Sequence, residues 1–177
     1  MDWSKAKNII IAALLVANLM IGGNLWKQYS AEQTQLRLAA EETVAFLEAA
    51  GMQIDAPLPG QEKKLPVLFL RLHKDGEALT ETQYKDYPIV VEGSGISYEI
   101  AGTGQQAAQT ITAAEALLKL YARLSAERSV QGMRVEEIDL VYLLSPEAAS
   151  YAAQDTASPA WRIRVDGRTY YVDAYGE

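Results

Sequence analysis

An uncharged stretch near the N-terminal end, Ile9 to Leu25, constrains this 177-residue chain more than any other feature of its sequence. As an α-helix, its 17 residues would extend about 26 Å at about 1.5 Å per residue. That length is near the shortest that crosses a bilayer. Trp3 and Trp26 flank the stretch at positions suited to the two lipid–water interfaces. The sequence therefore predicts a transmembrane helix over residues 9–26, with both tryptophans as interface anchors.

The charges beside this stretch predict its orientation. Lys5 and Lys7 precede it, and Asp2 is the one opposing charge. Positive residues favour the cytoplasmic side, so residues 1–8 are expected in the cytoplasm and the rest of the chain outside the cell membrane, as in a single-pass protein.

Two other interpretations of the stretch stay open. A cleaved signal peptide also has a basic start and an apolar core, and Gly22 and Gly23 supply small residues, although bulky residues follow them. A type IV pilin also begins with a long apolar helix. The Gly-Phe processing site and the following Glu that pilins share do not occur here.

Three residues within the stretch are candidates for a contact with another helix. Asn18 carries an amide, which seeks a hydrogen-bond partner in an apolar environment. Gly22 and Gly23 permit close approach of a second backbone. We take Asn18, Gly22 and Gly23 as the candidate helix interface.

The remaining sequence predicts one arrangement twice. The first unit, residues 30–110, begins with a helix over 30–50 that Gly51 ends, and continues with strands over 66–73, 87–92 and 96–101. Ser30 and Gln33 could form a capping box that separates this helix from the membrane helix. Since Gly and Pro are absent between Trp26 and Ala50, one continuous helix is equally compatible with the sequence.

The second unit, residues 111–177, repeats the order. A capping box of Thr112 and Glu115 begins a helix, and strands follow over 135–144, 161–165 and 168–175, with a hairpin turn at Asp166-Gly167. Gly51-Met52 and Gly132-Met133 occupy corresponding places in the two units. The expected fold class is therefore α+β: a transmembrane helix followed by two duplicated units, each a helix on a three-stranded antiparallel sheet.

Composition excludes several functions. The net charge of −7 without a basic patch argues against a nucleic-acid partner. The chain has no cysteine, and His73 is its one histidine, so the sequence indicates no metal site and no catalytic site. Motifs for binding phosphate or a dinucleotide are also absent, so we expect no cofactor and no enzymatic activity.

Both ends of the chain resemble a known family. The start, Met-Asp-Trp-Ser-Lys-Ala-Lys-Asn-Ile-Ile from Met1 to Ile10, resembles YycI-type proteins, which are membrane-anchored regulators in the YycH/YycI family. The ending contains Pro159-Ala160-Trp161-Arg162-Ile163, Asp166-Gly167 and the run from Tyr171 to Glu177. It looks like the closing hairpin of PepSY-like domains and like the C-terminal part of YycI.

This resemblance implies a function that composition does not reveal. YycI-type proteins, with YycH, associate with the cell-wall sensor histidine kinase WalK (also YycG) of Gram-positive bacteria and modulate its output. The expected function is thus a membrane-anchored accessory regulator of such a kinase, with the membrane and a YycH-type protein as further partners. The alternative is an extracytoplasmic PepSY-like binding module that captures or inhibits a protease or peptide.

Overall fold

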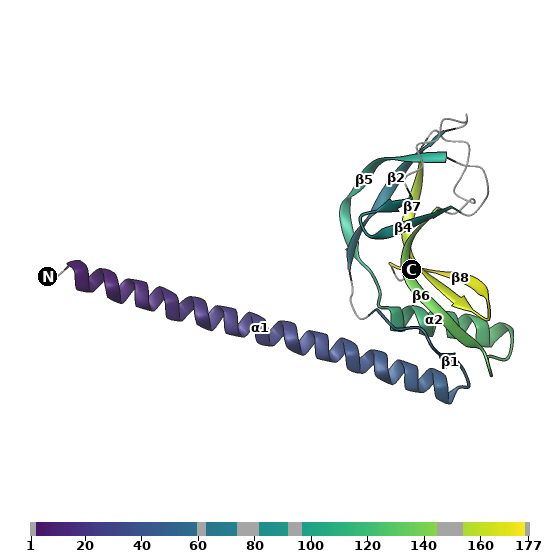
Figure 1. Cartoon of the computed structure of the whole chain (residues 1–177), viewed down its shortest axis with the longest axis horizontal. Coiled ribbons are helices and arrows are strands. Elements are labelled where there is room, and N and C mark those ends of the chain that lie inside the picture. The colour runs from purple at the N-terminus through teal and green to yellow at the C-terminus, as the bar shows by residue number, and fades with distance from the viewer. Residues whose placement is uncertain (1–2, 60–62, 74–81, 92–96, 145–153, 176–177) are drawn as a thin grey trace. The chain divides into compact units, whose positions relative to one another are not determined.

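The computed structural model describes residues 3–59, 63–73, 82–91, 97–144 and 154–175. The chain divides into two compact units, residues 1–38 and 39–177, and each is considered by itself. Figure 1 labels the elements, which are α1 (Trp3–Ala49), β1 (Gln53–Ile54), β2 (Lys64–His73), β3 (Gln83–Tyr84), β4 (Tyr87–Val91), β5 (Ser97–Gln109), α2 (Ala113–Glu127), β6 (Arg134–Leu144), β7 (Gln154–Val165) and β8 (Arg168–Asp173).

Helix α1 is continuous from Trp3 to Ala49. Of the two alternatives that the sequence allowed, two separate helices or one continuous helix, the structure has the continuous helix. Its end was predicted correctly. Gly51 has a φ of +95°, a left-handed conformation that glycine adopts readily. The N–H of Gly51 donates to the carbonyl of Glu48 at 2.9 Å, and the N–H of Met52 donates to that of Leu47 at 3.0 Å. This pair of hydrogen bonds is a Schellman motif, which satisfies the last carbonyls of the helix.

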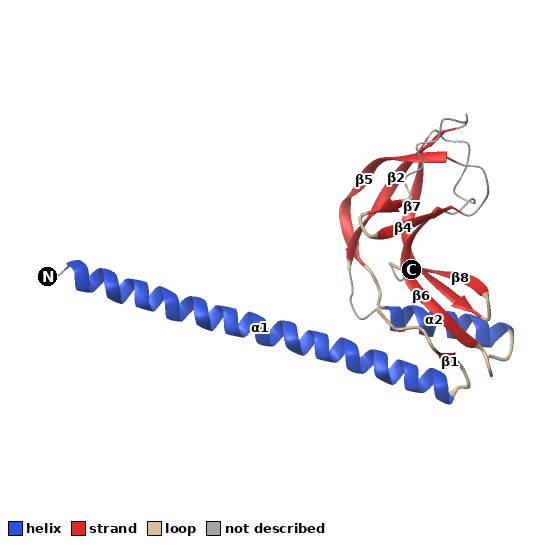
Figure 2. Cartoon of the chain, viewed as in Figure 1, coloured by secondary structure: helices blue, strands red, loops and turns tan. Residues whose placement is uncertain are grey.

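Helix α2 also begins where the sequence predicts. The N–H of Glu115 donates to Oγ1 of Thr112 at 3.2 Å, and the N–H of Thr112 donates to Oε2 of Glu115 at 2.8 Å, so the capping box is complete. The apolar stripe of α2 is buried, including Leu117, Leu120 and Leu124. Figure 2 shows the helix beside the sheet, where it contacts β7 and β8.

The described strands form one eight-stranded sheet in the order β3-β4-β6-β7-β2-β5, with β1 added beside β6 and β8 beside β7. The long antiparallel pair of β6 and β7 lies at its centre. The edge of β6 that faces away from β7 pairs in parallel with β1 at one end and with β4 at the other. The edge of β7 that faces away from β6 pairs antiparallel with β8 and then with β2. Besides pairing with each other, β6 and β7 thus each pair with two further strands, one after the other along their length.

Pro159 lies where β7 changes neighbours. Ala160 pairs with Asp173 of β8, whereas Ala157 pairs with Leu68 of β2. The carbonyl of Pro159 accepts from the N–H of Ala174 at 3.1 Å, so its nitrogen faces this same edge. Because proline has no N–H to donate, it fits the place where one neighbour ends and the next begins.

The predicted fold class is wrong in the arrangement of its strands. The second half has the expected order, since β6, β7 and β8 form an antiparallel meander with α2 against it. In the first half, β2 pairs with β5, whereas β4 pairs in parallel with β6. The strands of both halves thus share one mixed sheet, and the two predicted units do not have the same strand order. Residues 102–109, which follow the predicted third strand, are part of β5.

The predicted fold class is also wrong in its first element. Among the residues that the structure describes, no helix is long and apolar enough to cross a membrane.

The two Gly-Met segments that suggested duplication lie against each other. The N–H of Gly132 donates to the carbonyl of Gly51 at 2.7 Å, and the N–H of Gln53 donates to that of Met133 at 2.8 Å. Both methionines are buried. These segments lead into the parallel pairing of β1 with β6, so they are neighbours in one ladder and not equivalent places in two separate units.

Aromatic residues anchor the core through their polar atoms. Nε1 of Trp161 donates to the carbonyl of Ile111 at 3.0 Å. The hydroxyl of Tyr142 donates to the carbonyl of Pro66 at 3.0 Å, and that of Tyr175 donates to the carbonyl of Leu65 at 2.9 Å. Burial is the largest cause that raises the pKa of the Tyr142 hydroxyl above its ordinary value of 10.0. The two tyrosine bonds join the C-terminal half of the chain to the start of β2.

We predict that Gly51→Ala lowers the free energy of unfolding by about 1–2 kcal/mol, because an L side chain is strained at this φ. A Cβ at this position would also lie 3.3 Å from Cα of Gln131. Gly102→Ala is the control, since nothing lies within 4 Å of its added Cβ and it should stay within about 1 kcal/mol of wild type. Urea denaturation measures both. Equal losses in the two variants would contradict the assigned role of Gly51.

A second prediction concerns alkaline pH. The folded chain holds the Tyr142 proton more tightly than the unfolded chain does, since its pKa is raised from 10.0. This contribution to stability is fully present below about pH 10 and is lost as pH rises through the folded pKa. We expect the free energy of unfolding to fall less steeply above about pH 10 in Tyr142→Phe than in wild type. Tyr121→Phe is the hydroxyl-removal control, and identical slopes in all three proteins would be the contrary result.

Candidate functional site

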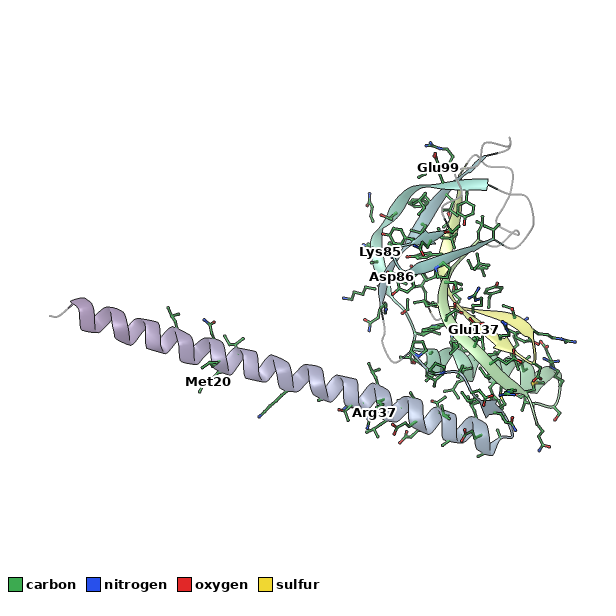
Figure 3. The ribbon with its side chains drawn as sticks, in the orientation of Figure 1. Met20, Arg37, Lys85, Asp86, Glu99 and Glu137 are labelled. Carbon is green, nitrogen blue, oxygen red and sulfur yellow. The ribbon has the colours of Figure 1, made fainter. Side chains whose placement is uncertain are left out.

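A cluster of charged side chains lies on the face of β6 and β7 that is turned away from the core. On β6, Ile138 and Leu140 are buried, so Glu137 and Asp139 face the opposite side. On β7, Arg162 and Arg164 alternate in the same way with buried Trp161, Ile163 and Val165. The register pairs Asp139 with Arg162 and Glu137 with Arg164. We call Glu137, Asp139, Arg162 and Arg164 the outer-face cluster. Figure 3 labels Glu137 within it.

Arg162 makes the shortest ion pair of the cluster. Its Nε donates to Oδ1 of Asp139 at 3.0 Å and its Nη2 donates to Oδ2 at 2.7 Å, so the pair is bidentate. The hydrogen bond that Arg162 donates to Asp139 is the largest cause that raises the pKa of Arg162. Arg164 makes longer ion pairs, at 3.6 Å to Glu136 and 3.4 Å to Glu137. The cluster is therefore a network of two carboxylates and two guanidinium groups, and Glu136 adds a third carboxylate beside it.

Two hollows lie along this face. The first, of about 270 Å³, is lined by the outer-face cluster and Thr169. The second, of about 250 Å³, is more apolar, and its lining comprises Leu143, Thr156, Ser158, Pro159, Ala160, Tyr171 and Asp173. Arg162 of the first hollow pairs in register with Tyr171 of the second. A surface of this kind can bind a partner that offers polar and apolar groups in sequence.

The next question is whether the described residues could bind a metal ion. Within the residues that the structure describes, no group of three or more His, Cys, Asp or Glu side chains could hold a metal ion. His73 is the last residue of β2, and its side chain lies outside the described part.

The candidate helix interface lies on α1. Asn18 and Gly22 are both exposed, and their spacing of four residues places them on one side of the helix. Nothing lies within 4 Å of the position that a Cβ on Gly22 would take. Helix α1 also contains Gly23, Trp3 and Trp26. The side chains of both tryptophans and the exposure of Gly23 lie outside the described part of the chain.

Large apolar side chains surround this interface. Leu14, Leu19, Met20 and Ile21 are 59–74 % exposed. Figure 3 labels Met20 on α1. Successive residues of an α-helix are rotated by about 100°, so residues 19, 20 and 21 point in three different directions. This part of α1 is thus apolar around most of its circumference.

Sequence reasoning missed the outer-face cluster. Arg162 and Arg164 alternate with apolar residues in the sequence, and Glu136 is adjacent to Glu137, but neither feature by itself indicates a pairing. The register that places these residues opposite each other is a property of the strand pair, and neither strand alone specifies it. An alternating acidic strand beside an alternating basic strand is the signal that could have suggested the pairing.

Comparison with known proteins adds no family to these observations. No family model matches the chain, and no curated protein sequence matches it.

We predict that the Asp139–Arg162 pair stabilises the folded chain more than an exposed helical pair does. A double-mutant cycle of Asp139→Ala and Arg162→Ala should give a coupling energy of about 1 kcal/mol, since the pair is bidentate and two-thirds shielded. The Arg123–Glu127 pair is the control. Its side chains are more than 60 % exposed and 3.7 Å apart, so its coupling should be below about 0.5 kcal/mol. Comparable coupling in both cycles would refute the distinction.

Proposed function

We propose that the chain is an accessory regulator that binds a sensor histidine kinase of the WalK (YycG) type at the cell membrane and modulates its activity. The resemblance of Met1 to Ile10 and of the C-terminal hairpin to YycI-type proteins supports the choice of partner. The observation that carries the proposal is the exposed apolar surface of α1 around Asn18 and Gly22.

This surface calls for an apolar partner. Removing a large apolar side chain from water contributes about 1.5–3 kcal/mol, and four such side chains are exposed between Leu14 and Ile21. In the proposal, helices of the kinase cover this part of α1. Gly22 allows a partner backbone to approach closely, and the amide of Asn18 donates to or accepts from a polar group of the partner.

Regulation requires only a small preference for one state of the kinase. A binding difference of about 1.4 kcal/mol between two kinase states shifts their equilibrium about tenfold. In the proposal, α1 contributes this preference, and the sheet unit supplies a second contact with the kinase. A YycH-type protein is a further partner in the same assembly.

The outer face supports a second candidate function. Two neighbouring hollows, one charged and one partly apolar, suit the side chains of an extended peptide. They favour the PepSY-like module that captures or inhibits a protease or peptide. The two functions differ in the region that they require, because the regulator depends on α1 and the peptide-binding module depends on the outer face.

The test replaces Ile9–Leu25 with an unrelated Leu/Ala-based helix of equal length. We expect less kinase to co-purify from cell membranes and a changed output from its target promoters. Arg162→Ala in the outer-face cluster is the comparison, and it should retain most kinase binding. Two results together would favour the peptide-binding module instead. The chain with the replaced helix would keep wild-type kinase binding and promoter output, and Arg162→Ala would reduce kinase binding.

A single substitution sharpens the test. Asn18→Leu should reduce co-purified kinase by about 3- to 30-fold, the ratio for an interhelical hydrogen bond of about 0.6–2 kcal/mol. Gln35→Leu removes another exposed amide of α1 and is the matched control. Equal kinase recovery with both variants would remove the amide of Asn18 from the interface.

A further inference from the structure

The strands β6, β7 and β8 place polar side chains in two rows across the outer face. In the first row, Glu137 of β6 pairs in register with Arg164 of β7, and Arg164 pairs with Thr169 of β8. In the second row, Asp139 pairs in the same way with Arg162. Residues paired in register share one face, and neighbouring strands are about 4.8 Å apart. The first row thus presents a carboxylate, a guanidinium group and a hydroxyl group side by side.

The two rows differ in how firmly their charges are paired. The ion pair of the second row is bidentate, with a shortest distance of 2.7 Å. In the first row, Arg164 lies 3.4 Å from Glu137 and 3.6 Å from Glu136 beside it. Both distances exceed the about 2.7–2.9 Å of a charge-assisted hydrogen bond. The Thr169 hydroxyl has no hydrogen-bond partner among the residues that the structure describes. The first row can therefore still form short bonds to a ligand.

The hollow that these rows line limits what such a ligand can be. Its volume of about 270 Å³ is slightly below the range of about 300–1,000 Å³ that is usual for ligand pockets, so it suits a small molecule. A simple anion would face the carboxylates of Glu137 and Asp139, and a simple cation would face the guanidinium groups of Arg162 and Arg164. Half of the charged lining would repel either one. A small molecule that carries both charges is attracted by all of it.

We propose that this hollow binds the zwitterionic head of a free α-amino acid. The ammonium group donates to Glu137, and the carboxylate accepts from Arg164 and from the hydroxyl of Thr169. One carbon atom joins the two charged groups, and this short separation suits side chains on neighbouring strands. An inner residue of a peptide has neither charge, so a peptide that spans the hollow would not be held in this way. None of these residues belongs to α1, so the site does not depend on the proposed kinase contact.

Titration with glycine tests the site, because glycine carries both charges and has no side chain. The full chain is kept in neutral detergent at low ionic strength, since salt screens exposed charges. We expect the nuclear magnetic resonance signals of the Arg164 Nε–H and of the Thr169 amide to shift and to saturate as glycine is added. N-acetylglycine keeps only the carboxylate, and glycinamide keeps only the ammonium group. Each should bind at least about tenfold more weakly, because it loses a charge-assisted hydrogen bond. No saturable shift with glycine, or equal affinity for glycine and either analogue, would overturn the proposal.

Two charge-removing variants test the two ends of the ligand separately. Glu137→Gln should weaken glycine binding about tenfold but strengthen N-acetylglycine binding, because it removes a carboxylate that repels the anion. Arg164→Gln should also weaken glycine binding about tenfold but strengthen glycinamide binding, for the opposite reason. The Thr169 amide reports binding in both variants.

The control for these variants is Arg123→Gln on α2, which breaks another exposed ion pair and should keep wild-type affinity for all three compounds. Stronger binding of one analogue cannot come from a loss of folding, so the paired variants also exclude that explanation. Wild-type glycine affinity in both Glu137→Gln and Arg164→Gln, or an equal loss for all three compounds, would contradict the assigned roles and overturn the site.

Discussion

The antiparallel pairing of β6 with β7 is the interaction on which the rest of the sheet depends. Both strands are long enough to accept two neighbours in succession on their outer edges. On one face, their alternating apolar residues pack with α2 and with Leu47 at the end of α1. On the other face, the alternate positions carry the outer-face cluster. One pair of strands thus gives rise to the core and to the charged surface, because side chains on a strand alternate between two faces.

The junction between α1 and the sheet depends on a few backbone bonds. The positive φ of Gly51 ends the helix, and the chain then enters the parallel ladder beside Gly132 and Met133. The carboxylate of Asp55 accepts from the guanidinium of Arg134 just beyond this ladder. These contacts hold the last turns of α1, from Ala39 to Ala49, within the sheet unit. A partner that binds this unit can therefore also contact the end of the helix.

The two surfaces considered for function have different physical characters. Removing the apolar part of α1 from water lowers the free energy, and in the proposed interface Asn18 and Gly22 supply the specificity. The outer face is polar, and most of its charges already have partners, so binding there depends on how well a ligand matches the network. The first character suits association with helices, and the second suits recognition of a charged or extended ligand.

The sequence by itself determined the local elements of this protein. Gly51, the Thr112–Glu115 capping box and Asp166-Gly167 each act through neighbouring residues, and the helix ends and the final turn lie where these residues predict. Only the tertiary structure decided which strands pair. The parallel contact of β4 with β6 joins residues about fifty positions apart, and nothing in either strand specifies that partner. The outer-face cluster depends on such long-range register, so it could not be identified from the strands singly. The two Gly-Met segments show the same limit, because their likeness suggested two copies of one unit, whereas in the fold the segments contact each other directly.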